Sequence, residues 1–280
     1  MDHLNNWWPV DKVILAYFAA VTLLEIVYWQ PILIAAHIAA TGLLWLAVRY
    51  PASRISQVFH PWYPLIYVSA SYKEMAILIP LARSWTADKF LARLDFQVWG
   101  VHPSVWLERW QSPVAVEILQ ICYSLFIPAV VVVAAILWRK REEFRRYAFL
   151  AALGFLVSYV GYFLVPARGP RFLLAGLQTR ELQGLWISHS LSLLIDRLES
   201  AHYDCFPSGH TELAILAWWG SRSISRNFSW AMFVYLISVI LATIYLRYHY
   251  TMDVVAGIGV AWVLILVSPW LYNRLSGRAA

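Results

Sequence analysis

The chain has 280 residues, of which 61% are apolar and only 14% are charged, and its formal net charge is +6. This composition excludes an ordinary soluble domain and predicts a polytopic membrane protein. Its basic residues fall between apolar stretches and not along one face, so nucleic-acid binding is not expected, and with two cysteines no disulfide framework is expected.

Apolar stretches long enough to cross a bilayer, which takes about 20 residues in a helix, recur along the whole chain. They predict an all-α fold, a membrane-embedded bundle of about eight transmembrane helices. The sixth is short, and no cleavage pattern follows the first, which is therefore expected to remain. The eight predicted spans are 13–29, 31–48, 63–82, 114–138, 147–165, 209–219, 230–246 and 254–271.

Arginine and lysine gather in the connections after every second predicted span, at 49–54, 139–146, 222–226 and 274–278. Positive charge marks the cytoplasmic side, so both termini are expected inside the cell. Segments 83–113, 166–207 and 247–253 then face the outside or periplasm. The compact chain has no long hydrophilic tail, which favours a bacterial inner membrane over a eukaryotic lumenal membrane.

The outer segment 83–113 mixes apolar and charged residues at helical spacing. Phe90, Leu94 and Val98 fall on one stripe, whereas Asp88 and Asp95 occupy other positions. This pattern predicts an amphipathic helix lying in the membrane interface. Segment 182–198 alternates in the same way but is too short to span, and it is expected to form one or two short helices over the outer mouth.

Among the charged residues inside predicted spans, where a central charge is costly, Glu25, Lys73 and Glu74 stand out. They are expected to face the bundle interior or water. For Lys73 and Glu74 a structural polar network and a place in the lining of the site both remain open. Glu117 and Gln120 could contribute to a headgroup pocket or to helix packing.

Three polar clusters stand at the outer ends of neighbouring spans, at 166–171, 204–211 and 247–253. Antiparallel neighbours would bring them together in one pocket at the membrane surface. The middle cluster contains Pro207, Ser208, Gly209 and His210 at the start of an apolar helix, an arrangement that presents backbone N–H groups and a histidine to an anion.

His249 and Asp253 are four residues apart, so on a helix they would share one face. Asp253 could then accept a hydrogen bond from one imidazole nitrogen and stabilise the positive charge that develops when the other nitrogen attacks. His249 is the predicted nucleophile. His210, when protonated, could deliver a proton to the departing oxygen.

Guanidinium groups match phosphate oxygens in charge and geometry. The predicted phosphate-binding residues are Arg168, Arg171, Arg247, Ser208 and Gly209. A zinc site built from His202, His210, His249 and Asp204 is the weaker alternative, because no tight pair of histidine ligands occurs and the arginines would repel a cation. No metal or cofactor is therefore expected.

These motifs resemble those of the type 2 phosphatidic acid phosphatase superfamily. Its second motif, Pro-Ser-Gly-His, is complete at 207–210, and its third is matched by His249 and Asp253. Thr243 stands where that motif has arginine, and no lysine follows Lys140, so Arg247 and the pair Arg168 and Arg171 would replace the missing cations. The variant looks most like the inositol phosphorylceramide synthase branch.

The resemblance implies a six-helix core over residues 60–280, preceded at 1–50 by two additional helices. It also implies a metal-independent phosphoric ester hydrolase with a phosphohistidine intermediate on His249 and His210 as proton donor. We expect a lipid phosphatase acting on a phosphatidate or polyprenyl phosphate or pyrophosphate. The alternatives are a headgroup phosphotransferase with an alcohol acceptor and a non-catalytic anionic-lipid binder or transporter. The oligomeric state is open.

Overall fold

The computed structural model describes residues 6–198 and 202–277, so Arg278 of the last basic cluster lies outside the described residues. Within these ranges the chain is helical, and its only β-type pairing is an isolated bridge between Ala167 and Asp204. The helices are α1 (Pro9–Val27), α2 (Pro31–Arg49), α3 (Arg54–Ala82), α4 (Asp88–Trp99), α5 (Pro103–Trp106), η2 (Leu107–Trp110), α6 (Pro113–Ser124), α7 (Phe126–Leu137), α8 (Arg141–Leu164), α9 (Pro170–Leu173), η3 (Ala175–Leu177), α10 (Ser188–Leu198), α11 (Gly209–Ser221), α12 (Arg226–Tyr245) and α13 (Thr251–Leu275).

Local sequence explains where several helices begin. Proline occupies the first turn of α1, α2 and α6, where its missing N–H costs no hydrogen bond. Other helices start behind a serine whose hydroxyl accepts a hydrogen bond from the backbone N–H three residues later. These capping serines are Ser53, Ser112, Ser208 and Ser225.

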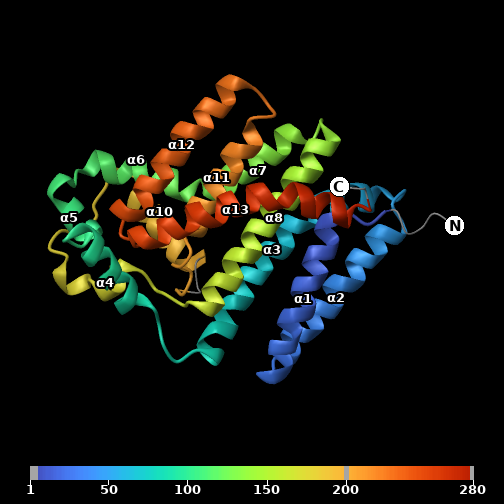
Figure 1. Ribbon diagram of the computed structural model, residues 1–280, viewed down its shortest axis with the longest axis horizontal. Helices are drawn as coiled ribbons and strands as arrows, with labels where there is room; N and C mark the ends of the chain where they lie inside the picture. The colour runs from blue at the N-terminus through green and yellow to red at the C-terminus, as the bar shows by residue number, and fades with distance from the viewer. Residues whose placement is uncertain (1–5, 199–201, 278–280) are drawn as a thin grey trace.

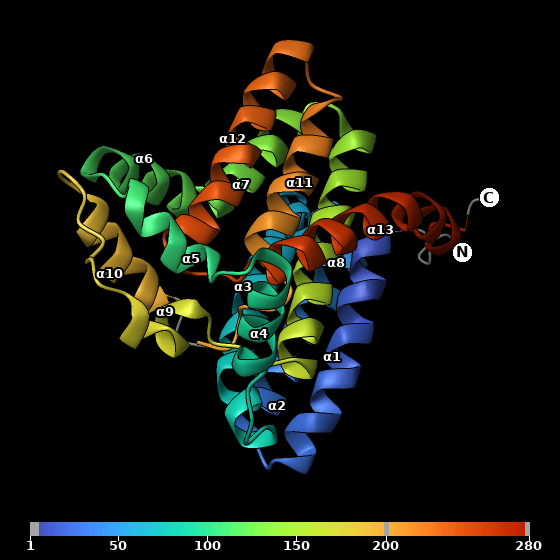
Figure 2. The same cartoon turned by 60° about the vertical axis from the view of Figure 1, so that its left-hand side comes forward.

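The helices form one bundle with a smaller group of short helices at one side (Figure 1). α1 and α2 make an antiparallel hairpin that packs on α3, while α8 runs through the middle of the bundle against α1, α3, α11 and α13. Figure 2 shows that α5 and α10 lie on the side opposite the two chain ends. Lys12 Nζ donates to the Leu275 carbonyl at 2.6 Å, so the first and last helices meet.

Five described helices are long and apolar enough to cross a membrane: α2, α3, α8, α12 and α13. α6 and α7 would add a sixth span, although they are bent by 49° at Leu125, where the sequence predicted a single helix. The predicted count of eight is not confirmed. The first and sixth predicted spans are the two that fall short: α1 carries the charged residues Asp11, Lys12 and Glu25, and α11 has only 13 residues.

α11 is short because it lies inside the protein. A 13-residue helix extends only about 20 Å, less than a bilayer core, but nearly all of its residues are buried. It packs against α7, α8, α12 and α13, which surround it (Figure 2). The residues at its start are therefore enclosed by four helices, and this is where the Pro-Ser-Gly-His stretch lies.

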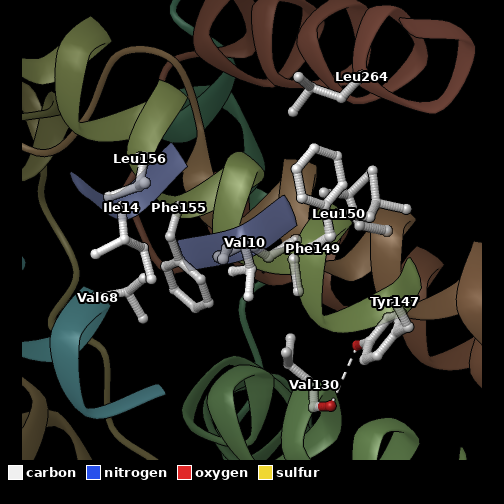
Figure 3. Packing of buried hydrophobic residues seen from close by; sticks show 14 of the residues in the cluster. Val10, Ile14, Val68, Val130, Tyr147, Phe149, Leu150, Phe155, Leu156 and Leu264 are labelled. Carbon is white, nitrogen blue, oxygen red and sulfur yellow. Dashed lines mark hydrogen bonds between the residues drawn. The ribbon is translucent and has the colours of Figure 1, made fainter. Parts of the chain in front are cut away.

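The apolar core joins the N-terminal helices to the rest of the bundle. Figure 3 shows Val10 and Ile14 of α1 near Val68 of α3 and Phe155 of α8. Tyr147 adds a hydrogen bond from its hydroxyl to the Val130 carbonyl at 3.2 Å. Lipid chains are as apolar as these side chains, so within a membrane the helices are held together by close van der Waals packing and by hydrogen bonds between helices.

The predicted amphipathic helix is present as α4, and both of its aspartates are buried. Asp88 and Asp95 are buried, together with Leu91, whereas Phe90 and Val98 are exposed. These carboxylates can be buried because Asp88 accepts hydrogen bonds from the backbone of the loop after α8, and Asp95 accepts them from the first turn of α13, which compensates their desolvation.

Candidate active site

The start of α11 is held tightly in place. Ser208 caps the helix: its hydroxyl accepts from Thr211 N at 3.3 Å and donates to Thr211 Oγ1 at 3.0 Å. Ser208 N donates to the Asp253 carbonyl at 3.0 Å, which ties this turn to α13. A Cβ at Gly257 would lie 2.5 Å from the Ser208 carbonyl oxygen, so only glycine permits this approach. The mouth of α11 and the start of α13 form one unit.

His249 lies in the loop between α12 and α13, two residues before the helix begins. The sequence predicted that it would share a helix face with Asp253, and the structure corrects this. The nearest acceptor of His249 Nδ1 is the Cys205 carbonyl oxygen, at 2.8 Å. That bond places the proton on Nδ1 and leaves the lone pair on Nε2. Nε2 is 3.4 Å from His210 Nδ1, so the two histidines face each other.

Asp253 remains beside His249 without orienting it directly. Its Oδ2 atom is 3.7 Å from His249 Nδ1 and accepts from Tyr250 N at 2.8 Å and from Cys205 Sγ at 2.7 Å. Burial, together with the Asp253 charge, raises the pKa of the Cys205 thiol well above its usual value. Cys205 is therefore a protonated donor to Asp253.

The His210 ring belongs to a column of stacked rings. It stacks on Tyr123 of α6 at a centroid distance of 4.1 Å, and Tyr123 stacks on Tyr248 at 4.1 Å. The Arg171 guanidinium lies 4.8 Å from the centroid of Tyr248. The column fixes the plane of His210 and carries a positive charge at its far end.

The three predicted arginines occupy different environments. The Arg168 side chain is exposed and lies over Phe172, while Arg171 pairs with Asp196 of α10 at 2.6 Å. Arg247 is buried and points into the neighbouring loops. Its guanidinium donates to the Glu108 carboxylate, to side-chain oxygens of Gln111 and Gln178, and to the Arg180 carbonyl. In this structure Arg247 therefore joins loops, and its predicted phosphate contact stays a prediction.

α4 fastens two of the three polar clusters to each other. Asp88 accepts from Arg168 N at 3.0 Å, from Gly169 N at 2.8 Å and from the Tyr250 hydroxyl at 3.1 Å. Asp95 accepts from Thr251 N at 3.0 Å and from Thr251 Oγ1 at 2.7 Å. The carboxylates thus hold the segment after α8 and the start of α13 in one geometry.

α10 covers the site from the side. Glu117 of α6 accepts hydrogen bonds from four consecutive backbone N–H groups just before and at the start of α10, those of Leu185, Trp186, Ile187 and Ser188. Near the other end of α10, Asp196 pairs with Arg171, and Lys73 Nζ donates to the Leu198 carbonyl. Glu117 is therefore a structural anchor for α10 in this structure.

A cavity of about 280 Å³ opens beside His210. Its wall is largely apolar, with Phe155 and Leu213 from the core, and Gly209 and Asp204 also line it. Lys73 lies on this wall, while the adjacent Glu74 is buried. The sequence left open whether Lys73 and Glu74 line the site. In the structure only Lys73 lines this cavity.

The structure brings together His210, His249, Asp253, Ser208 and Gly209, as the sequence predicted. Sequence reasoning missed the supporting residues Asp88, Asp95, Tyr123, Tyr248 and the Cys205 carbonyl. For Asp88 and Asp95 the sequence did contain a signal, because their spacing places them on one helix face with Leu91 and Ala92. The structure shows that this face is buried. His202 and Asp204 do not join a metal-capable group in the described ranges; such groups are formed there by Cys205, His249 and Asp253 and by Glu25, His37 and Glu74.

Comparison with known proteins gives one family. The family model of the PAP2 superfamily matches residues 89–267, which include every site residue that the sequence predicted but not Asp88 or Lys73. A PA-phosphatase related-family protein of Dictyostelium discoideum is 28% identical over 123 residues, which cover 40% of this chain and 22% of that protein. The chain thus matches less than a quarter of that relative's length. No solved structure matches the chain.

Proposed function

Because the chain belongs to the PAP2 superfamily, a family of phosphatases, and is built from membrane-length apolar helices, we propose that it is a lipid phosphatase that works through a phosphohistidine on His249. The observation that carries this proposal is the contact between His249 Nε2 and His210 Nδ1 at 3.4 Å, with His249 Nδ1 bonded to the Cys205 carbonyl. This geometry supplies a nucleophile with its lone pair directed at a second histidine that can transfer a proton.

In the first step, the lone pair of His249 Nε2 forms a bond to phosphorus while the bond from phosphorus to the lipid oxygen breaks. His210 gives a proton to that oxygen, so the lipid leaves as an alcohol or a shorter phosphate. Asp253, 3.7 Å from Nδ1, balances the positive charge of the phosphorylated ring. In the second step, water gives a proton to His210 and attacks phosphorus, which releases phosphate and restores His249.

Phosphate oxygens require positive partners during both steps. We assign this role to Arg171, at the end of the ring column, and to Arg168 on the same loop. Ser208 and the Gly209 N–H are assigned as neutral donors at the mouth of α11. The apolar wall of the cavity, which includes Phe155 and Leu213, fits an acyl or prenyl chain. The substrate class is therefore a phosphatidate or polyprenyl phosphate or pyrophosphate, and the chemistry uses no metal.

A headgroup phosphotransferase remains the second candidate. Asp204 and Lys73 line the same cavity as His210, and Tyr72 donates to Asp204 Oδ2 at 2.7 Å. Such polar groups could bind the hydroxyls of an alcohol acceptor, which would then take the place of water in the second step.

The family match begins at residue 89, after α1, α2 and α3. We propose that residues 1–50 form two additional helices and that residues 60–280 form the membrane-embedded core, with α3 assigned to the core because it packs along α8. We also propose that the protein resides in the bacterial inner membrane with its termini in the cytoplasm and its site facing the periplasm.

The test is to incubate the purified protein with labelled lipid phosphates, with and without candidate alcohols, and to identify the products by mass spectrometry. Free phosphate from the wild-type protein supports the phosphatase, whereas a new phosphodiester supports the transferase. His249→Ala and His210→Ala should each abolish turnover while the protein remains folded in detergent. Full activity in either folded variant would remove the mechanism.

A further inference from the structure

Three ionisable side chains meet between the first three helices, apart from the candidate site. They are Glu25 of α1, His37 of α2 and Glu74 of α3, and all three lie outside the family match. His37 Nδ1 is 3.2 Å from Glu25 Oε2, and His37 Nε2 is 3.2 Å from Glu74 Oε1. One nitrogen or oxygen atom from each residue lies within 4.8 Å of the other two.

The cluster is buried and its acceptors are not satisfied. Glu25 is 0% exposed and Glu74 is 5% exposed. Within the described residues, neither carboxylate oxygen of Glu25 nor the Oε1 atom of Glu74 accepts a hydrogen bond of good geometry, and their ion-pair contacts are both to the single imidazole of His37. The neighbours of His37 are the Thr22 hydroxyl, 2.8 Å from Nδ1, and the Phe18 ring, stacked at 4.2 Å. Buried carboxylates are normally paired or bound to a metal, so these atoms indicate a ligand.

We propose that Glu25, His37 and Glu74 bind a divalent metal ion of the zinc class. Two carboxylates and a neutral imidazole carry a charge of −2, which one divalent cation cancels, and these are ligand types that zinc accepts. Only one imidazole nitrogen of His37 can bind the ion, so only one of the two 3.2 Å contacts joins two ligand atoms, and its length suits this ion. Ligand atoms on a tetrahedral centre with bonds of about 2.05 Å are about 3.3 Å apart.

The other metal-capable group, Cys205, His249 and Asp253, differs in this respect. His249 Nδ1 already bonds the Cys205 carbonyl, and Asp253 Oδ2 already accepts from Tyr250 N and Cys205 Sγ. Those atoms have partners without an ion. In the Glu25 cluster two carboxylates share one imidazole, and three of their oxygens accept no hydrogen bond of good geometry, which is why the metal belongs between the first three helices.

An ion at this position would be structural. Each ligand comes from a different helix, so the ion links α1 and α2 to α3. α3 also contributes Lys73 to the cavity beside His210, one residue from Glu74. The ion therefore stabilises the hairpin on the bundle and takes no part in the chemistry at His249, so this proposal goes beyond the proposed function.

The test uses the full-length protein in detergent after treatment with a chelator. Co²⁺ should produce the visible absorption of a tetrahedral site, Zn²⁺ should displace it, and elemental analysis should find one Zn²⁺ per chain. Saturating Zn²⁺ should raise the Tm by about 5 °C. Glu25→Gln and Glu74→Gln should lose the Co²⁺ spectrum and the Tm shift, and both should fold because each removes a buried charge.

Two control variants locate the site. Glu143→Gln makes the same change at an exposed position of α8, and Cys205→Ser alters the other metal-capable group. Both should keep the spectrum and the Tm shift. The proposal is overturned if the wild-type protein binds neither ion at micromolar concentration, or if the Glu25→Gln and Glu74→Gln variants bind as tightly as wild type. These readouts do not depend on turnover, so failure of the proposed phosphatase activity would leave them unchanged.

Discussion

At the scale of single residues, the chemistry proposed for His249 depends on a backbone atom. The Cys205 carbonyl fixes the proton on Nδ1, and Asp253 contributes charge from 3.7 Å. In many enzymes a carboxylate does both, holding the imidazole and stabilising its positive form. Here orientation and charge come from different groups, so they can be separated by mutation.

Asp253→Asn removes the charge and keeps a side-chain oxygen for Tyr250 N and the Cys205 thiol. We expect kcat to fall about 100-fold, the typical effect of losing one group that stabilises transition-state charge, while KM changes little. Steady-state kinetics on a soluble lipid phosphate measures both constants. Cys205→Ser is the control, because it retains the carbonyl and a hydroxyl donor; equal losses in the two variants would contradict the assigned role of Asp253.

At the scale of elements, α4 fixes the relative positions of two polar clusters that are distant in sequence, 166–171 and 247–253. Asp88 binds the backbone at Arg168 and Gly169, and Asp95 binds the first turn of α13. Gly169 has a positive φ of 98°, a conformation suited to glycine, and its N–H points to Asp88. The interfacial helix is thus part of the framework of the site.

Asp88→Ala and Asp95→Ala should each lower the free energy of unfolding by about 1 to 3 kcal/mol, because buried backbone donors lose their acceptors. Asp88→Ala should also raise KM, since the loop with Arg168 is released. Thermal unfolding in detergent and steady-state kinetics provide the two measurements. Lys89→Ala, an exposed change on the same helix, should behave as wild type; if it destabilises α4 equally, the carboxylates are not the cause.

In the proposed mechanism, α10 would compete with the substrate for the Arg171 cation. Arg171 pairs with Asp196 of α10, and a bound phosphate would have to share or displace that carboxylate. Asp196→Ala should therefore lower KM about two- to fivefold, in line with the small energy of a partly exposed ion pair. Arg171→Ala should raise KM. An Asp196→Ala variant whose KM rises would show that the pair positions Arg171 for the substrate.

At the scale of the whole molecule, the site and the basic end are separated by the length of α8. Lys12 binds the end of α13, the Arg145 guanidinium lies over Trp8, and the Arg146 guanidinium lies over Tyr272. Both chain ends and the basic start of α8 therefore gather at one end of the bundle (Figure 1). α8 then runs for 24 residues, about 36 Å, to the loop with Arg168.

This separation agrees with a cytoplasmic basic end and an outward-facing site. A reporter fused after the C-terminus should therefore report the cytoplasm, and one inserted near Gln178 should report the periplasm. Paired alkaline phosphatase and fluorescent-protein fusions give opposite signals on the two sides, so each site serves as the control for the other. The reverse pattern would place the chemistry on the cytoplasmic face and require another substrate pool.

The helical membrane fold and the central site residues could be predicted from the sequence. Apolar length specifies membrane-length helices, and Pro207 to His210, with His249 and Asp253, carry the chemistry in their residue types and spacing. The number of spans could not be predicted. Whether α11 contacts lipid or is enclosed by four other helices depends on packing, which apolar composition does not distinguish.

Tertiary structure alone decided which group orients His249 and which charges are buried. Backbone carbonyls have no sequence signature, so the bond from His249 to Cys205 follows only from the approach of two loops. The burial of Asp88 depends on the N–H groups that a distant loop brings to it. Residue types thus determined the chemistry available to the chain, and long-range packing determined which atoms meet, because a hydrogen bond or ion pair requires both partners to be placed within about 3 Å.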